Sequence, residues 1–290
     1  MEKKLNIKKL FESLNTWHKH NKIIFPWDKT EDPYYAFVAG YCAQQTQISR
    51  VIILWKKFIE AYPTIEILAN ANTADLLTIW GNAGYPKRAL SMQNAAQIIL
   101  KKNQGIIPKN ITELTHLPGI GPYTASVILA FGYKQNVPTI DINFKRILGR
   151  YFLGDELAKD KDIKKITDLL TKESDYHFWN SAIMDFGSLM CTSRPKCEIC
   201  IMNINCKAFL KPTKEIKKKN KKKVFIGSNR YYRGKILKLL RERKTKSIDI
   251  KIVYRELKKE RINTEKINKI IKSLNDDSLI YLEKEILHLG

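Results

Sequence analysis

Apolar residues recur at three- and four-residue steps along most of the first 210 residues, which is the periodicity of amphipathic helices. Residues that end helices fit the same pattern, because Pro63, Gly81 and Gly105 stand at or just beyond the ends of periodic segments. No long alternation of polar and apolar residues, the pattern of a strand, occurs before residue 224. The pattern therefore predicts an all-α body, with its clearest helical repeats at 34–62, 73–80, 87–102 and 124–131.

Beyond residue 226 the pattern changes to three short helices and a hairpin. Amphipathic helices are predicted at 231–243, 252–259 and 264–274, and two strands at 279–282 and 285–289. Three helices followed by a hairpin are the outline of a winged helix, which commonly lays its last helix in a DNA groove. The alternative is a domain that packs only on the body or on a protein partner.

The chain is strongly basic, with 52 Lys and Arg against 29 Asp and Glu and a formal net charge of +23. Residues 211–290 hold 25 basic and 10 acidic side chains, so the excess is concentrated near the C-terminal end. This charge argues against a neutral metabolic enzyme and for an anionic partner such as nucleic acid. Residues 211–223, with eight lysines, predict an exposed linker that either faces DNA phosphates or only aids solubility.

With 44% hydrophobic residues the chain can form a core, and it contains no run of about 18 uncharged apolar residues. The first twenty residues lack the apolar block of a secretory signal. We therefore expect a cytoplasmic, nucleoid-associated protein that does not contact a membrane.

Four of the five cysteines fall within 16 residues, with the spacing C-x5-C-x2-C-x5-C. In a chain of this kind the spacing predicts thiolates that converge on a metal centre rather than disulfides. Zinc and an iron-sulfur cluster both accept four thiolates, and the spacing leaves both open. The candidate ligands are Cys191, Cys197, Cys200 and Cys206, whereas Cys42 is expected to be a small buried side chain.

The segment from Leu117 to Ala125, LPGIGPYTA, is a glycine- and proline-rich turn followed at once by a helix. Backbone N–H groups at such a helix start can hold a phosphate. Val137 to Arg146, VPTIDINFKR, follows, and the cysteines come about fifty residues later.

The glycine- and proline-rich turn at 117–125, here called the helical hairpin, is followed by an aspartate and then by four cysteines. This order resembles the endonuclease III superfamily of helix-hairpin-helix DNA glycosylases. Three further segments, QQTQ at 44–47, WGNAGY at 80–85 and MDFG at 184–187, resemble its MutY-type adenine glycosylases. The resemblance covers roughly residues 20–210. Residues 227–234 are similar to a subgroup that ends in a winged helix instead of the usual 8-oxoguanine-sensing domain.

The resemblance implies a two-lobed, all-α fold, a 4Fe-4S cluster in preference to zinc, and a monomer that acts on double-stranded DNA with a mismatched or damaged base. DNA is kinked between the lobes in this family, and the target base is flipped out, which costs a few kcal/mol. The implied domains are a cluster-bearing lobe (1–29 and 136–210), a six-helix barrel with the hairpin (30–135), a basic linker (211–226) and the winged-helix domain (227–290).

The resemblance also assigns the site. Asp141 is the carboxylate that stabilises the oxocarbenium-like sugar while the N-glycosidic bond breaks, and it can also cap the helix beginning near Asn143. Asn143 orients Asp141 or the attacking water, Gln45 fills the vacated stack, and Thr46 lies near the orphaned base. The expected DNA-binding residues are Gln44, Gln45, Thr46, Tyr85, Leu117, Gly119, Gly121 and Thr124.

Tyr123 bears on the reaction class. Bifunctional members carry at this position a lysine that attacks the sugar as a Schiff-base nucleophile, and tyrosine has no amine for that step. The resemblance therefore implies a monofunctional enzyme that releases the base by water attack, without lyase activity. A tyrosine here is also similar to that of an archaeal thymine/uracil mismatch glycosylase.

Gly40 departs from the family pattern, which has a glutamate that protonates the flipped adenine. A positioned acid is worth about 10² to 10⁴ in rate. Three explanations stay open: another acid enters the pocket, the substrate needs less protonation, or the protein binds lesions without cutting them. The sequence thus predicts excision of adenine opposite guanine or 8-oxoguanine, with a thymine/uracil glycosylase and a non-catalytic lesion binder as alternatives.

Overall fold

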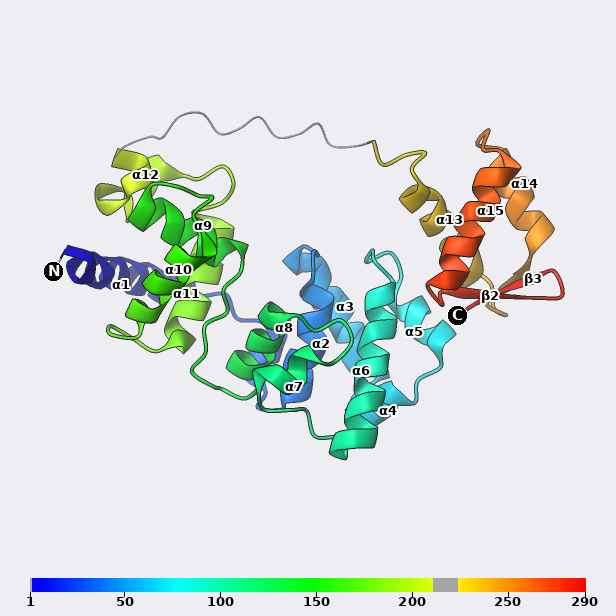
Figure 1. Ribbon diagram of the computed structural model, residues 1–290, viewed down its shortest axis with the longest axis horizontal. Coiled ribbons are helices and arrows are strands. Elements are labelled where there is room, and N and C mark those ends of the chain that lie inside the picture. Colours follow the sequence, from blue (N-terminus) through cyan, green and yellow to red (C-terminus); the bar gives the residue numbers. More distant parts are fainter. Residues whose placement is uncertain (1, 211–223) are drawn as a thin grey trace. The chain divides into compact units, whose positions relative to one another are not determined.

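The protein was analysed as a computed structural model that describes residues 2–210 and 224–290. Its internal contacts form two compact units (Figure 1). The first unit comprises Met1–Phe37, Lys109–Thr115 and Ile120–Lys218, and the second comprises Val38–Pro108, His116–Gly119 and Lys219–Gly290. Most of the linker predicted at 211–226 lies outside the described residues.

The first unit is helical. Its core is built where α11 packs against α1 and α9, and α10 packs against the same two helices. Buried aromatic and aliphatic side chains such as Leu10, Phe144, Trp179 and Phe186 fill this core. The elements are α1 (Glu2–Asn21), η1 (Pro26–Lys29), the start of α2 (Pro33–Ala43), α7 (Ile111–Thr115), α8 (Pro122–Val127), the π-helical turn η2 (Ile128–Gly132), α9 (Ile142–Leu148), the π-helical turn η3 (Gly149–Leu153), α10 (Asp160–Leu170), α11 (Tyr176–Leu189), η4 (Cys197–Ile199), η5 (Asn203–Asn205) and α12 (Lys207–Leu210).

Residues 120–135, predicted as part of the barrel, group with this first unit because η2 packs on α11. Side-chain caps fix two helix starts here, since Asp141 accepts from the amide of Phe144 and Asp175 from the amide of Phe178.

The second unit begins within α2 and continues through four helices: α3 (Ile48–Ala61), α4 (Ile65–Ala69), α5 (Thr73–Trp80) and α6 (Lys87–Asn103). The predicted helix stops are confirmed, because α3 ends before Pro63, α5 ends at a Gly81 with φ 57°, and α6 is followed by Gly105 with φ 82°. The predicted repeat at 34–62 is divided by a turn at 44–47, where Gln45 has φ 53°.

The C-terminal part of this unit, residues 224–290, is called the C-terminal domain below. It contains the three predicted helices and the hairpin, together with a short strand that the sequence did not indicate. Its elements are α13 (Asn229–Arg241), β1 (Ser247–Asp249), α14 (Ile250–Lys258), α15 (Thr264–Asp276), β2 (Ile280–Glu283) and β3 (Ile286–Leu289).

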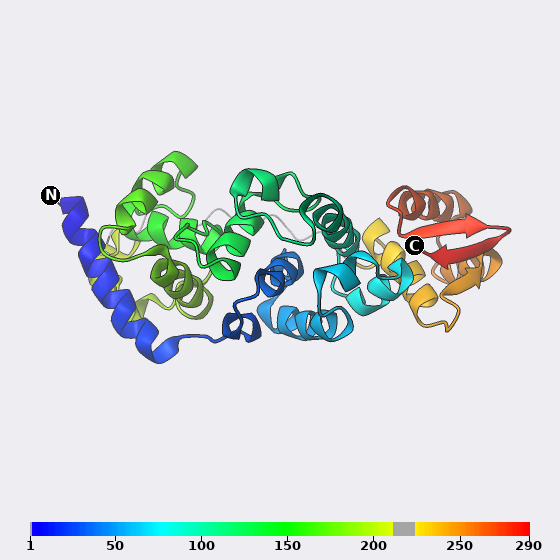
Figure 2. The same ribbon diagram turned by 90° about the horizontal axis from the view of Figure 1, so that it is seen from below.

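The strands form an antiparallel sheet in the order β1-β3-β2. Figure 2 shows the hairpin of β2 and β3 as two adjacent arrows. Its two turn residues, Lys284 and Glu285, both have positive φ, as a two-residue hairpin loop requires. Leu287 and Leu289 of β3 face the domain core, where they join Ile236, Leu240 and other buried residues of the helices.

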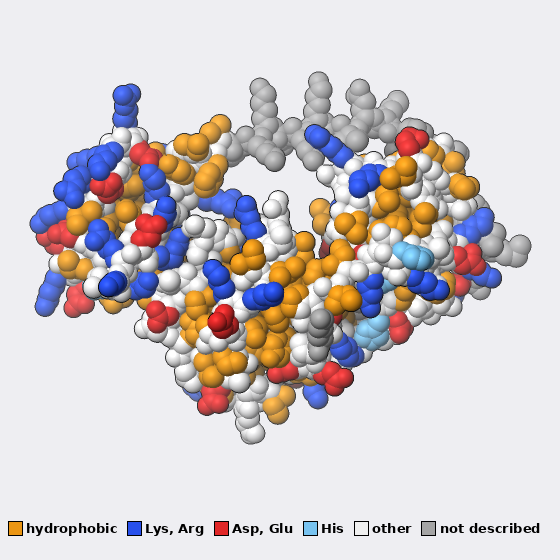
Figure 3. All heavy atoms as spheres, turned by 180° about the vertical axis from the view of Figure 1, so that it is seen from behind, with side chains coloured by type: hydrophobic (Ala, Val, Ile, Leu, Met, Phe, Trp, Pro, Cys, Tyr) orange, Lys and Arg blue, Asp and Glu red, His pale blue; other side chains and the backbone are white. Residues whose placement is uncertain are grey.

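Lys and Arg side chains, interspersed with Asp and Glu, cover much of the C-terminal domain on the face drawn in Figure 3. Among the described helices, none combines the length and the apolar character that a membrane span requires.

Candidate functional site

Asp141 is held in one orientation at the N-terminus of α9. Its Oδ1 accepts the backbone amide of Phe144 at 2.7 Å, and its Oδ2 accepts Nδ2 of Asn143 at 2.7 Å. Burial raises the pKa of this carboxyl above its usual range, and the two hydrogen bonds and the charge of Arg146 oppose that rise. The carboxylate is therefore fixed and partly desolvated, as a group that must face a developing positive charge should be. Helix capping and this candidate role coexist in one side chain.

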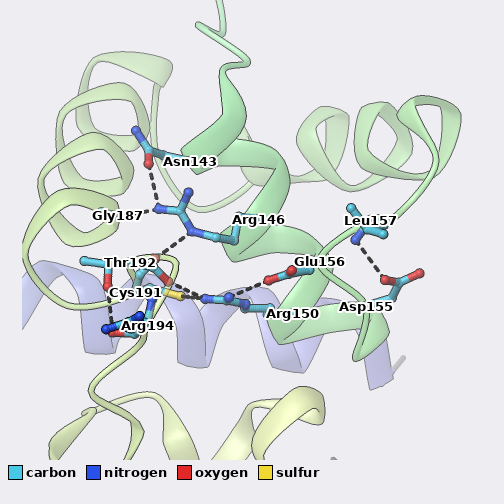
Figure 4. A network of polar contacts seen from close by, with 10 residues as sticks. All are labelled: Asn143, Arg146, Arg150, Asp155, Glu156, Leu157, Gly187, Cys191, Thr192 and Arg194. Carbon is cyan, nitrogen blue, oxygen red and sulfur yellow. Dashed lines mark hydrogen bonds and ion pairs between the residues drawn. The ribbon is translucent and has the colours of Figure 1, made fainter. Parts of the chain in front are cut away.

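Arg146 connects Asn143 to the segment that carries the cysteines (Figure 4). Its Nη2 donates to Oδ1 of Asn143 at 2.6 Å and to the carbonyl of Gly187 at 2.9 Å, and its Nε donates to the carbonyl of Cys191 at 2.7 Å. A continuous chain of hydrogen bonds thus runs from Asp141 to Cys191. It couples the candidate catalytic carboxylate to the start of the cysteine cluster.

A second arginine lies on the cysteine side of this network. Arg150 is buried in η3 and donates to the carbonyl of Thr192 at 2.8 Å, while its Nη1 lies 3.5 Å from Sγ of Cys191. Its guanidinium also pairs with the carboxylate of Glu156 at 2.5 Å. Arg150 therefore brings a positive charge to the sulfur of one candidate ligand.

The four clustered cysteines form no disulfide and are half-buried, and Cys191, Cys200 and Cys206 pack against the core of the first unit. Burial and neighbouring thiols raise the pKa values of Cys197 and Cys206, and the same causes raise that of Cys200 to about 11. Their mutual influence shows that the sulfurs share one neighbourhood. Within the described residues, however, no three His, Cys, Asp or Glu side chains stand close enough together to hold a single metal ion.

Tyr123 belongs to α8 and lies close enough to the Asp141 carboxylate for that charge to influence its ionisation. Its side chain is 37% exposed, and burial together with the carboxylate raises its pKa well above the ordinary value. The hydroxyl is consequently protonated at neutral pH and can donate a hydrogen bond. The structure therefore brings together three predicted catalytic residues, Asp141, Asn143 and Tyr123, in the first unit.

The second unit carries the QQTQ segment at 44–47, which forms a turn inside the stretch predicted as helical. Nε2 of Gln44 donates to the carbonyl of Gly119 at 2.9 Å, and Oγ1 of Thr46 donates to the carbonyl of Gln44 at 3.1 Å. Gln45 is exposed, in a left-handed conformation that is uncommon outside glycine. Its side chain thus stands away from the turn that its two neighbours stabilise.

Arg88 organises this turn from α6. It donates to the backbone carbonyls of Tyr41, Cys42 and Gln44 and to Oγ1 of Thr46. Its guanidinium also lies 4.9 Å from the ring of Trp80 and donates to the carbonyl of Gly84 at 3.0 Å. One half-buried cation thereby joins the 44–47 turn to the 81–85 segment.

The predicted DNA-binding residues of the helical hairpin at 117–124 differ in solvent exposure. The side chains of Leu117 and Thr124 are buried, whereas Gly119 and Gly121 are exposed. A Cβ on Gly119 would lie 2.8 Å from Cβ of Ser91 and 2.9 Å from the ring of Tyr41, and its φ is 77°. A Cβ on Gly121 would meet nothing within 4 Å. Packing inside the protein thus requires glycine at position 119. At position 121 the surface at the start of α8 has room for a side chain.

Tyr85 is 48% exposed and has φ 47°. Gly40, where the family pattern has a glutamate, is buried within α2. The next residue, Tyr41, donates its hydroxyl hydrogen bond to the carbonyl of Pro118, and burial raises its pKa far above the ordinary value. Burial also raises the pKa of Cys42 to about 12, as expected of a small buried side chain.

Four residues of this site were not predicted as site residues from the sequence: the arginines Arg88, Arg146 and Arg150, and Gly187. Arg146 could have been found, because it stands one helical turn after Asn143, the spacing at which side chains on a helix meet. The contacts of Arg88 and Gly187 join residues about 45 positions apart, which no local pattern indicates.

The chain is similar to known DNA repair proteins. The sequence profile of the HhH-GPD superfamily base excision DNA repair proteins matches residues 38–172. The adenine DNA glycosylase of Mycolicibacterium smegmatis is 31% identical over 237 residues, and the match covers 80% of each chain. That of Buchnera aphidicola subsp. Acyrthosiphon pisum is 36% identical over 216 residues, which cover 71% of this chain and 62% of the relative.

Solved structures agree with this relationship. A thermostable thymine-DNA glycosylase superposes with a TM-score of 0.65 at 25% identity, over 71% of this chain and 97% of its own. The ordered motifs, the helical fold and the relatives lead to one assignment. The chain belongs to the HhH-GPD superfamily of base excision DNA repair proteins, as a MutY-like DNA glycosylase.

Proposed function

We propose that the protein removes adenine opposite guanine or 8-oxoguanine from double-stranded DNA, by hydrolysis of the N-glycosidic bond. The observation that carries this proposal is Asp141, whose carboxylate is fixed by the amide of Phe144 and by Asn143 in a partly desolvated position. The substrate follows from relatives named adenine DNA glycosylases.

In this mechanism the Asp141 carboxylate stabilises the positive charge that develops on the sugar while the base departs. Asn143 keeps the carboxylate oriented, and Arg146 in turn fixes Asn143. Water then attacks the sugar and leaves an abasic site. Tyr123 donates a hydrogen bond into the site and supplies no amine, so strand cleavage through a Schiff base does not occur.

Gly40 makes protonation of the departing base the slow part of this reaction. Without a glutamate at this position, adenine excision is expected to be about 10² to 10⁴ slower than with a positioned acid. A thymine or uracil glycosylase is the second candidate, favoured by Tyr123 and by the likeness to a thymine-DNA glycosylase.

We further propose that Cys191, Cys197, Cys200 and Cys206 hold a 4Fe-4S cluster, which supplies structure to the cysteine segment. Four neighbouring thiols and the Arg150 guanidinium beside Cys191 supply the ligands and the positive charge for an anionic, thiolate-bound cluster, and the sulfurs would have to move closer together than they stand here to bind it. The visible absorption spectrum and the iron and sulfide content of the purified protein test this assignment. A zinc protein would contain one zinc per chain and no sulfide.

The DNA contacts proposed are those of the exposed Gln45 and Tyr85, of Gln44 and Thr46 beside them, and of backbone groups in the hairpin from Leu117 through Gly119 and Gly121 to Thr124. We propose a monomer that acts at the nucleoid in the cytoplasm. Sedimentation of the protein with and without a mismatched duplex tests the stoichiometry.

The deciding experiment uses duplexes that carry A opposite 8-oxoguanine, A opposite G, T opposite G and U opposite G, each followed by hot alkali. Cleavage that is confined to adenine supports the proposal. Cleavage that is confined to thymine and uracil would instead identify the protein as the second candidate, a thymine or uracil glycosylase. Retarded mobility without cleavage on any duplex points to a lesion-binding protein. Asp141→Asn should abolish excision while binding persists, and borohydride should trap no covalent complex.

A further inference from the structure

Within the second unit, the C-terminal domain contacts helix α5 and the segment that follows it, residues 81–88. Nη2 of Arg241 donates to Oδ1 of Asn82 at 2.7 Å. The carboxylate of Asp277 pairs with Nζ of Lys87 at 3.0 Å and, inside its own domain, with Arg233 at 2.6 Å. Burial lowers the pKa of Arg241, which shows that this guanidinium has lost much of its water. Residues 81–88, which comprise the loop after α5 and the first two residues of α6, are therefore attached to the C-terminal domain near both ends.

Tyr85 lies between these two attachments. The guanidinium of Arg230, in the first turn of α13, lies 4.8 Å from the centre of the Tyr85 ring, and that of Arg88 lies 5.8 Å from it. A Cβ on the neighbouring Gly84 would lie 3.5 Å from Nη2 of Arg230, so the two segments are close. One aromatic ring thus has a cation from the barrel and a cation from the C-terminal domain.

The backbone of Tyr85 depends on such support. Its φ of 47° costs a residue with a side chain of order 1 kcal/mol and persists only where the surroundings determine it. The carbonyl of Gly84 accepts from Nε1 of Trp80 at 2.9 Å and from Arg88, which fixes the backbone from the barrel side. Arg230 supplies the matching constraint on the ring itself.

A ring that is half-exposed and fixed in place is suited to stacking on a nucleic-acid base, because little rotamer entropy remains to be lost. The Arg230 cation over the ring face stabilises the position of the ring, and its positive charge attracts DNA phosphates. The ring can therefore stack on a base where the regular base stacking is disturbed, and Arg230 holds the ring in the position for that contact.

We propose that Arg230 is a positioning residue for Tyr85, through which the C-terminal domain sets how strongly the barrel prefers a mismatched duplex over a paired one. This inference rests on the proposed function only for the identity of the duplex. The competing role for Arg230 is a plain phosphate contact, which strengthens binding to all DNA equally.

Affinity for two duplexes separates these roles. The full-length, cofactor-loaded protein carries Asp141→Asn so that no base is removed, and the duplexes are A opposite 8-oxoguanine and its fully paired counterpart. The preference is the ratio of the two dissociation constants. Arg230→Ala should lower it about three- to five-fold, the scale of one exposed cation–π contact. Tyr85→Ala should lower it about tenfold or more, the scale of one stacked base.

The double variant Arg230→Ala/Tyr85→Ala should have the preference of Tyr85→Ala alone, since Arg230 acts through that ring. Arg230→Lys should recover part of the preference, because it keeps the charge and loses the planar face. Arg243→Ala is the matched control, as an exposed arginine of the same domain, and it should weaken binding to both duplexes alike.

Amide hydrogen exchange in the DNA-free protein provides a second test of the role of Arg230. Amides of residues 82–86 should exchange about threefold faster in Arg230→Ala, with an unchanged midpoint of thermal unfolding. The inference is overturned if Arg230→Ala leaves the preference intact, if its effect adds to that of Tyr85→Ala, or if the parent protein shows no preference. If no duplex is cleaved by the wild-type protein yet this coupling is found, the proposed reaction fails and the role of Arg230 stands.

Discussion

Gly187 of α11 lies directly against the side chain of Asn143, and a Cβ at Gly187 would come within 2.8 Å of the Asn143 Cβ and 3.0 Å of its Cγ. Neither atom is the flexible end of a side chain, so α9 and α11 would have to separate. The distance between these helices is thereby set by the absence of a side chain. That distance also determines where Asn143 presents its amide to Asp141.

Gly187→Ala should therefore slow excision without unfolding the protein. We expect a loss of about 1–3 kcal/mol of stability from overpacking and about a hundredfold lower rate from the displaced amide. Single-turnover kinetics and urea unfolding measure the two effects. Gly234→Ala in α13 is the control, because a Cβ there meets nothing within 4 Å, and unchanged kinetics for Gly187→Ala would contradict the role of this contact.

Asn143→Ala should move the acid limb of the pH–rate profile to higher pH. The reaction needs ionised Asp141, and the hydrogen bond from Asn143 favours the ionised form and lowers its pKa. Loss of that bond raises the pKa further, so the variant loses activity at a pH where the wild type keeps it. Asn268→Ala, in the C-terminal domain, should leave the limb in place.

The two glycines of the hairpin should respond differently to alanine. Gly119→Ala places a Cβ at 2.8 Å from Ser91 and 2.9 Å from Tyr41 at a φ of 77°, and should cost about 1–3 kcal/mol. Gly121→Ala meets open space at φ −91° and should leave stability within about 0.5 kcal/mol. If the hairpin faces DNA, Gly121→Ala should nonetheless weaken DNA binding. Equal stability losses in urea unfolding would refute the distinction.

His18→Ala should destabilise the first unit. Nε2 of His18 lies 3.1 Å from Oδ2 of Asp185, both side chains are buried, and that carboxylate also accepts the amide of Ile23 at 3.0 Å. Removal of one partner of such a pair costs about 3 kcal/mol. The exposed pair of Lys145 and Asp160 is the control, and Lys145→Ala should cost less than about 1 kcal/mol.

The loss of unfolding free energy caused by His18→Ala should become smaller at acidic pH. Burial raises the pKa of Asp185 in the folded protein, so the folded state holds a proton on this carboxyl more readily than the unfolded state does. Stability from this group therefore falls as the pH rises through the raised pKa. Below it the carboxyl is neutral and depends less on its hydrogen bond with His18, so the variant and the wild type should converge in urea unfolding.

Tyr123→Lys should create lyase activity. The burial that raises the pKa of the Tyr123 phenol would lower the pKa of a lysine amine at the same place, which is the condition for attack on a sugar carbon. Borohydride should then trap a covalent complex with DNA in the variant and none in the wild type. Trapping by the wild type would instead exclude the monofunctional mechanism.

The sequence predicted the helices and the C-terminal hairpin well, because their periodicity and stop residues are local. The strand β1 escaped because it has only three residues and pairs only with β3. The candidate carboxylate Asp141 and its partner Asn143 were found from ordered motifs. Their support was not, since Arg146 reaches carbonyls 41 and 45 residues away and the proximity of Gly187 exists only after α9 and α11 pack.

The end of α2 illustrates how far such dependence extends. Helices commonly stop at a glycine or asparagine, yet Ala43 is followed by Gln44 and Gln45. The carbonyls of Tyr41 and Cys42 in the last turn of α2, and that of Gln44 just beyond it, instead accept from Arg88 of another helix. A peptide of residues 33–50 should consequently continue as helix through 44–47 in a helix-promoting solvent. The turn that carries Gln45 therefore does not form from its own residues alone. If it were grafted into another protein, that protein would have to supply an arginine in the place of Arg88.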